Sequence, residues 1–209
     1  MPTLTGLAPD PRQPDYRLVE VDRGRFASLP ADAIQPLGLT VGVELEPATL
    51  DRLRALADVE AAQRAALRAL ARRAYARRDL ERRLVRKQHP PAAVDAALER
   101  LAVRGLLDDR RFAERYAALR AVRGRGPARL VRDLLAQGVE RATAEDAVRR
   151  ALDEEGIDPG LEARAVAVKR ASQLAGLPSP VRKRRLVAFL VRRGYATQHV
   201  KDLVQELCG

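Results

Sequence analysis

Three segments of the chain carry the same pair of leucines at the same spacing, and this repeat restricts the fold more than any other feature. The segments are LERRLVRKQ from Leu80, LVRDLLAQG from Leu130 and LVAFLVRRG from Leu186, so the unit recurs after 50 and then 56 residues. Apolar positions continue in step downstream, at Val94, Ala144 and Val200 and then at Leu98, Val148 and Val204. Spacings of three and four residues are typical of amphipathic helices. The chain is therefore predicted to consist of tandem helical units.

A further amphipathic segment precedes each leucine pair, so each unit is expected to hold three helices. The apolar positions of these segments are Leu67 and Leu70, then Phe112 and Tyr116, then Val166 followed by the degraded position Lys169. A unit of about 50 residues is marginal alone and gains stability by stacking on its neighbours, which gives an elongated, curved chain of helices. We predict a mainly α fold with three tandem three-helix repeats, over residues 61–105, 106–155 and 156–209.

The first 60 residues have a different pattern. Residues 1–15 contain four prolines and are predicted to be a disordered lead-in. Next, YRLVEVDRGRFASL alternates apolar and polar residues around Asp22-Arg23-Gly24, which predicts a β-hairpin, and LGLTVGVEL at 37–45 suggests a further β segment. From Pro47 the spacing becomes helical, with proline in a favoured first-turn position. We expect a small N-terminal β-hairpin plus a helix over residues 16–60.

Positive charge dominates the chain and is unevenly distributed. The formal net charge is +11 and the isoelectric point is near 10.8, which predicts attraction to polyanions or to an acidic protein surface. Residues 61–105 and 156–209 have formal charges of +8 and +6, whereas residues 1–60 have −4. The first and third repeats are therefore expected to carry the binding surface.

Arginines recur at helical spacing in the repeats, which would place them in rows along one helix face. Most charged rows are simply solvated surface, but these contain few intervening acids, which favours a binding role. Three further arginines flank the GRGP turn of the second repeat and could bind an acidic group. The candidate contacts are Arg64, Arg68, Arg72, Arg78, Arg82, Arg86, Arg123, Arg125, Arg129, Arg184, Arg185 and Arg192.

Sequence patterns of catalysis are missing. RGRGPARL lacks the spacing of a phosphate-binding loop, the single Cys208 excludes an internal disulfide, and His89 and His199 are accompanied by no carboxylate cluster. We therefore expect no enzyme activity, cofactor or metal. The lack of an N-terminal signal pattern and of an 18-residue apolar run predicts a cytoplasmic protein with no membrane contact. Because aromatic residues are few, simple single-strand binding is not the first interpretation.

Adjacent carboxylates at Asp108 and Asp109 are the strongest alternative to this non-catalytic interpretation, since they could hold a metal ion. The repeat instead favours Asp108 as a helix N-cap and Asp109 as a first-turn acid that interacts with the helix dipole. Other residues are expected at helix ends or on the inward helix face. The predicted structural junction residues are Asp108, Asp109, Phe112, Tyr116, Gly126, Pro127, Gly138 and Gly194.

The segments GLLDDRRFAERY, GRGPARLVRDLLAQGV and FLVRRGY resemble, in this order, those of the RecX family of RecA regulators. The N-terminal VDRGRFASLPADAIQPLGLTVGVEL is similar to the small β region of longer members, so the resemblance covers about residues 16–207. Two departures are Ala76, where many members have a capping serine, and Gln88, which replaces a frequent helix-ending glycine.

This resemblance implies tandem three-helix repeats and a monomer that binds RecA and the groove of RecA–single-stranded DNA filaments. The implied effect is inhibition of ATP hydrolysis, strand exchange and co-protease activity, together with weak direct DNA binding. The alternative is a helical DNA-binding module that acts without RecA, since the pair 128–137 and 144–152 could form a helix-turn-helix motif. Glu145 and Asp146 at the start of its second helix would face phosphates unfavourably.

Overall fold

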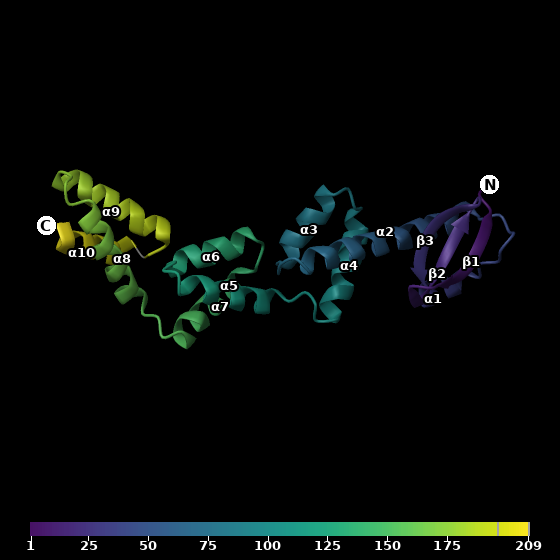
Figure 1. Cartoon of the computed structure of the whole chain (residues 1–209), viewed down its shortest axis with the longest axis horizontal. Helices are drawn as coiled ribbons and strands as arrows, with labels where there is room; N and C mark the ends of the chain where they lie inside the picture. Colours follow the sequence, from purple (N-terminus) through teal and green to yellow (C-terminus); the bar gives the residue numbers. More distant parts are fainter. Residues whose placement is uncertain (196, 209) are drawn as a thin grey trace. The chain divides into compact units, whose positions relative to one another are not determined.

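The computed structural model of the protein describes residues 1–195 and 197–208 (Figure 1). The side chains of residues 197–199 lie outside the description, and so does the interpretation of His199. The chain is mainly α-helical with a small sheet at its N-terminus, as the repeat pattern predicts. Within the described residues, no helix combines the length and apolar character needed to span a membrane.

A three-stranded antiparallel sheet forms the N-terminal region, with strands β1 (Leu4–Asp10), β2 (Gln13–Val21) and β3 (Gly24–Pro30) in that order. Val21 pairs with Gly24, so Asp22 and Arg23 form a two-residue turn with φ of 51° and 62°. Positive φ at both turn positions is typical of a type I′ hairpin, whose twist matches that of the strands. The predicted hairpin is therefore confirmed as β2–β3.

Two predictions for this region are wrong. Residues 1–15 are ordered, because β1 adds to the sheet and fully buries Leu4 in its core. Proline is tolerated there because β1 is an edge strand, where missing N–H groups interrupt no inner ladder. The segment 37–45 forms no strand, and its pairing is an isolated bridge between Thr3 and Glu44.

Helix α2 (Pro47–Leu70) joins the sheet to the first repeat. Two short elements, α1 (Ala31–Ile34) and η1 (Gln35–Leu37), precede it in the chain. Pro47 occupies the first turn of α2, and Leu53 packs with Leu4, Val19 and Leu29 of the sheet. The second half of the helix supplies the first helix of repeat 1. The expected boundary between residues 60 and 61 thus falls within one continuous helix.

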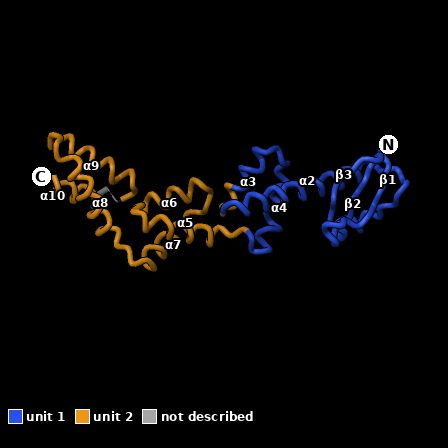
Figure 2. The backbone as a smooth tube through the Cα atoms, viewed as in Figure 1, with its two compact units in different colours: residues 1–73, 80–106 blue, residues 74–79, 107–209 orange. Residues whose placement is uncertain are grey.

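The remaining helices complete three three-helix repeats. Repeat 1 adds α3 (Arg77–Arg86) and α4 (Pro91–Val103), repeat 2 holds α5 (Asp109–Ala121), α6 (Pro127–Ala136) and α7 (Arg141–Glu154), and repeat 3 holds α8 (Pro159–Gln173), α9 (Ser179–Arg193) and α10 (Thr197–Cys208). Two compact units contain them (Figure 2), one of Met1–Arg73 and Leu80–Leu106, the other of Ala74–Asp79 and Leu107–Gly209. The elongated, curved arrangement of the repeats stays a prediction.

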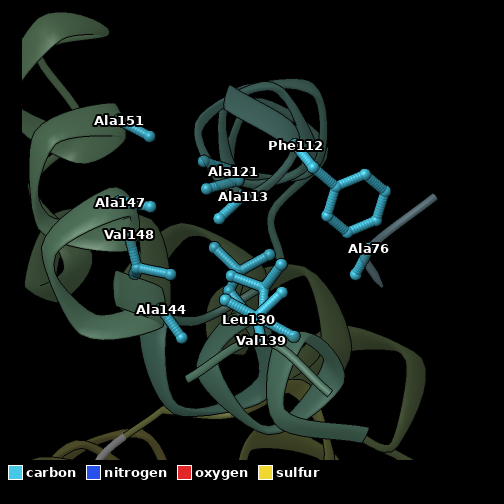
Figure 3. Packing of buried hydrophobic residues seen from close by; sticks show 12 residues of the cluster. Ala76, Phe112, Ala113, Ala121, Leu130, Val139, Ala144, Ala147, Val148 and Ala151 are labelled. Carbon is cyan, nitrogen blue, oxygen red and sulfur yellow. The ribbon is translucent and has the colours of Figure 1, made fainter. Parts of the chain in front are cut away.

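Each repeat has a core built on its leucine pair, whose members are at most 1% exposed. The first helix of each repeat contributes mainly alanine to this core, at Ala62, Ala66 and Ala69 in α2, Ala113, Ala117 and Ala121 in α5, and Ala163 and Ala167 in α8. Figure 3 shows Ala113 and Ala121 facing Ala144, Ala147 and Val148. Small side chains let helices approach closely, so larger ones such as Leu67 are not needed in the core. Leu67, an apolar position of the predicted amphipathic segment, is 38% exposed and lies outside this core.

Candidate functional site

The arginine row of the first repeat begins on α2. Arg64 and Arg68 lie one helical turn apart and are both exposed. Arg72 is also exposed but follows the end of the helix at Leu70, so it extends the row from the connecting turn. The structure therefore places two of these three guanidinium groups on a rigid helix and one in a turn.

A second row lies on α3, where Arg78, Arg82 and Arg86 are all exposed. Arg78 also has a packing role, because a Cβ built on Gly138 would lie only 2.4 Å from the Arg78 Cβ. The base of this side chain therefore touches the end of α6, which belongs to the same compact unit. Arg78 serves a repeat junction as well as the surface.

The row of the third repeat lies on α9, where Arg184, Arg185 and Arg192 are exposed. The Phe189 ring on the same helix lies 5.5 Å from the Arg170 guanidinium and 5.1 Å from that of Arg193. Both separations are within the range of cation–π attraction. Arg170 and Arg193 are not among the predicted contacts, because helical spacing alone gives no sign that both meet one ring.

Two of the three candidate arginines around the GRGP turn of repeat 2 form ion pairs within the protein. Arg125 and Arg129 both pair with Asp133, the latter through Nε at 2.8 Å from Oδ1. The Arg120 guanidinium lies 3.7 Å above the ring of Tyr116, and burial, followed by the nearby Asp133 carboxylate, raises the pKa of that tyrosine. We call these five residues the Asp133 cluster. An external anion that binds Arg125 or Arg129 must share these guanidinium groups with the Asp133 carboxylate or displace that carboxylate.

Arg123 lies in the same turn and is exposed. Asp133 and Arg120 are not among the predicted site residues, although the spacing of four residues between Arg129 and Asp133 is that of a helical ion pair. The GRGP turn therefore presents Arg123 together with two partly exposed guanidinium groups, those of Arg125 and Arg129, that share a single internal carboxylate.

The carboxylates of Asp108 and Asp109 each accept a hydrogen bond from the backbone at the start of a helix. Asp108 is the N-cap of α5, and its Oδ1 accepts a hydrogen bond from the Arg111 backbone N–H at 3.0 Å. Asp109 accepts from the backbone N–H of Arg77 at 2.6 Å, so it caps the first turn of α3, a helix that begins 32 residues earlier. This carboxylate takes the place of the capping side chain that Ala76 cannot supply. Among the described residues, no three His, Cys, Asp or Glu side chains are grouped as metal ligands.

The aromatic residues of this junction lie on the inner side of α5. Phe112 is 8% exposed and belongs to the core of repeat 2, together with Ala76. Tyr116 is half-buried, and the two ring centroids are 6.0 Å apart. The pair therefore helps to join the start of α3 to α5.

A backbone junction connects repeats 2 and 3. The Gly126 N–H donates to the Arg193 carbonyl at 2.8 Å, and the Ala128 N–H donates to the Gly194 carbonyl at 3.1 Å. Pro127 opens α6 at this point. Gly194 has φ of +91°, and a Cβ there would lie 2.2 Å from the Arg129 backbone nitrogen. A glycine is therefore required by both the backbone conformation and the close approach of α6.

The same corner is closed by two side-chain bonds to one carbonyl. Tyr195 donates from its hydroxyl to the Gly124 carbonyl at 3.3 Å, and Arg193 donates to the same carbonyl from Nη1 at 3.0 Å.

In repeat 1 the residue at the matching helix end is Gln88, with φ of +65°. Gln88 thus adopts the left-handed conformation with a side chain present, while α3 ends nearby at Arg86.

Family models of RecX match the chain in three places. The first, second and third three-helix domains match residues 62–101, 108–148 and 162–204. The chain is 41% identical to the regulatory protein RecX of Halorhodospira halophila over 143 residues, 68% of this chain and 85% of that protein. It is 39% identical to the regulatory protein RecX of Thermobifida fusca over 153 residues, 71% of this chain and 80% of the relative.

Two solved structures have a similar fold. A crystal structure of regulatory protein RecX is matched over 99% of this chain and 100% of that chain, with a TM-score of 0.75 at 17% identity. A crystal structure of RecX from Lactobacillus salivarius is matched over 72% of this chain and 96% of that chain, with a TM-score of 0.59 at 20% identity. At these identities the likeness concerns the fold, and the first match includes the N-terminal sheet.

Proposed function

Since the chain belongs to the RecX family of regulatory proteins, we propose that it regulates the RecA recombinase, mainly negatively. In this proposal it binds RecA and lies in the groove of RecA–single-stranded DNA filaments. It inhibits ATP hydrolysis, strand exchange and co-protease activity through its contacts, as a cytoplasmic monomer without a cofactor and without catalysis of its own.

The observation that carries the proposal is the set of exposed arginine rows on α2, α3 and α9. Each row is attached to a repeat whose core holds a buried leucine pair, so the helix positions that carry its arginines are held by a packed core. Arginine can form two parallel hydrogen bonds with a phosphate or a carboxylate. One scaffold can therefore contact both DNA phosphates and acidic side chains of a protein filament.

Mechanistically, the proposal needs no chemistry beyond binding. Repeats stacked along a groove would contact more than one RecA protomer, and bridging contacts oppose the relative motion of the protomers that accompanies ATP turnover. Protein placed in the groove also obstructs an incoming duplex. The ionic part of this binding is expected to weaken as salt rises, because exposed charges are screened.

Titration of the protein into the DNA-stimulated ATPase reaction of RecA tests the proposal. Binding of the protein to the same DNA without RecA is measured in parallel by fluorescence anisotropy. We expect strong inhibition at protein concentrations that barely occupy bare DNA. Tight, sequence-specific duplex binding without any effect on the ATPase would instead favour the helical DNA-binding module.

A further inference from the structure

A cleft between the N-terminal sheet and α2 has a volume of about 560 Å³ and lies within one compact unit. We call it the sheet–helix cleft. Sheet residues Arg12, Arg25 and Phe26 line one side of it, and Asp58 and Arg64 of α2 line the other. The candidate row of α2 therefore begins in this cleft, at Arg64. The surrounding segment carries excess acid overall, so net charge along the sequence conceals this local group of arginines.

Asp10 also lines the sheet–helix cleft and fixes the chain there. Its carboxylate is only 6% exposed and accepts hydrogen bonds from the Ser28 hydroxyl at 2.6 Å and from the Arg12 backbone N–H at 2.9 Å. These two bonds, the serine bond foremost, hold the pKa of Asp10 below its usual value. The carboxylate is thus ionised at neutral pH with both oxygens engaged, and it holds the turn that carries Arg12.

Phe26 gives the cleft a second kind of surface. Its side chain is half-buried against the core of the sheet while it also lines the cleft. Single-stranded nucleic acid is held by positive charge along its backbone together with aromatic rings on which bases stack. The three arginines of the cleft supply the positive charge and Phe26 supplies the ring. An acidic peptide would need only the positive charge.

We propose that the sheet–helix cleft binds a nucleotide unit of a single DNA strand. Arg12, Arg25 and Arg64 contact phosphate, Phe26 stacks with a base, and the strand continues from the cleft toward Arg68. Asp10 and Asp58 are the acidic groups of the lining, and both limit the affinity for phosphate. This inference rests on the DNA contact in the proposed function and assigns a binding role to the N-terminal sheet.

The experiment compares two double variants of the full chain that lose the same charge. Arg12→Ala with Arg25→Ala removes two of the three cleft arginines and keeps Arg64. Arg23→Ala with Arg52→Ala removes two exposed arginines of the same unit that are outside the cleft lining. Binding to a fluorescein-labelled oligothymidylate is measured by anisotropy over a range of salt concentrations. The cleft variant is expected to lower the slope of log K against log salt by about 1.4, the value for two lost phosphate contacts on a single strand. Equal slopes for the two variants would overturn the inference.

A Phe26→Leu variant tests the stacking part while keeping apolar packing against the sheet. We expect its affinity for the oligothymidylate to fall about fivefold or more, with its salt slope unchanged. Binding to poly-L-glutamate should be equally weak for Phe26→Leu and the parent protein. Unchanged oligothymidylate binding, or a selective loss of polyglutamate binding in the Arg12/Arg25 variant, would contradict a nucleotide site.

Assays with RecA separate this inference from the proposed function. If the parent protein fails to inhibit the RecA ATPase while the cleft variants lose oligothymidylate binding as expected, the proposed function fails and the cleft site stands. If the parent protein inhibits RecA while the cleft variant and its control bind oligothymidylate equally, the regulator stands and the cleft site is refuted.

Discussion

The two repeat junctions are made at equivalent helix ends but with different groups. At each, the end of a repeat's middle helix lies against the start of the preceding repeat's middle helix, with Gly138 against Arg78 and Gly194 against Arg129. The second junction is formed by backbone bonds from Gly126 and Ala128. The first also contains a carboxylate, because Asp109 caps α3. A Cβ added at either glycine should therefore disrupt its junction, and the first junction should also weaken through loss of one side chain, that of Asp109.

The largest expected effect is that of Gly194→Ala. Alanine in the left-handed region is strained by about 1–2 kcal/mol, and its Cβ would meet the Arg129 backbone nitrogen at 2.2 Å. We expect a total loss of about 3 kcal/mol or more in the free energy of unfolding, measured by urea denaturation. Gly156→Ala is the control, since its φ is +61° but nothing lies within 4 Å of the new Cβ. Equal losses for the two variants would contradict a steric origin.

Asp109→Ala is expected to have the next largest effect. It removes the acceptor for the Arg77 N–H and should lower the free energy of unfolding by about 1 kcal/mol. Asp109→Asn keeps an acceptor oxygen and should lose less stability. Asp108→Ala is the comparison, since it removes only the local cap of α5. In hydrogen exchange, Asp109→Ala should expose the first turn of α3, which Asp108→Ala should leave protected. If either variant lost RecA binding while its stability stayed unchanged, the carboxylate it removes would be a contact with RecA and not a helix cap.

Asp133→Asn should change binding more than stability. Its two ion pairs are partly exposed, so we expect a stability loss below about 1 kcal/mol. Releasing Arg125 and Arg129 should strengthen binding to oligothymidylate by about threefold. An unchanged or weaker affinity would show that these arginines serve the fold of repeat 2 and contribute no contact.

The smallest effect concerns a cap away from both junctions. Glu140 accepts from the backbone N–H groups of Ala142 and Thr143 at the start of α7, and these bonds lower the pKa of Glu140. Its contribution to stability is therefore present above the unfolded-state pKa near 4.5 and disappears as pH falls through the lower folded-state value. Thermal denaturation of Glu140→Gln and the parent protein should differ at pH 7 and converge in acid. A constant difference at all pH values would exclude this carboxylate as the cause.

The sequence predicted those features that depend on local spacing. Leucine pairs at helical intervals identify the repeats, and Asp108 lies where an N-cap belongs. The alanine faces of α2, α5 and α8 escaped prediction because hydrophobic periodicity gives most weight to large side chains. Strand β1 escaped because the four prolines of residues 1–15 suggest disorder, although β1 itself contains only Pro9 and pairs along a sheet edge.

Prediction of the candidate site was limited by contacts between distant residues. Asp109 meets Arg77 across 32 residues, and the cleft brings Arg12 and Arg25 of the sheet close to Arg64 of α2. Neither arrangement leaves a periodic pattern in the sequence. Helical spacing did identify the exposed rows, whose role as RecA and DNA contacts stays a prediction.

The most direct test of the account is inhibition of the RecA ATPase by two triple variants of equal charge. Arg64→Ala, Arg68→Ala and Arg72→Ala together remove the row of α2, and Arg23→Ala, Arg52→Ala and Arg54→Ala remove exposed arginines outside it. We predict that the row variant needs at least about tenfold more protein for half-inhibition and shows a weaker salt dependence, while the control stays close to the parent protein. Full inhibition by the row variant, or inhibition that does not respond to salt, would contradict the account.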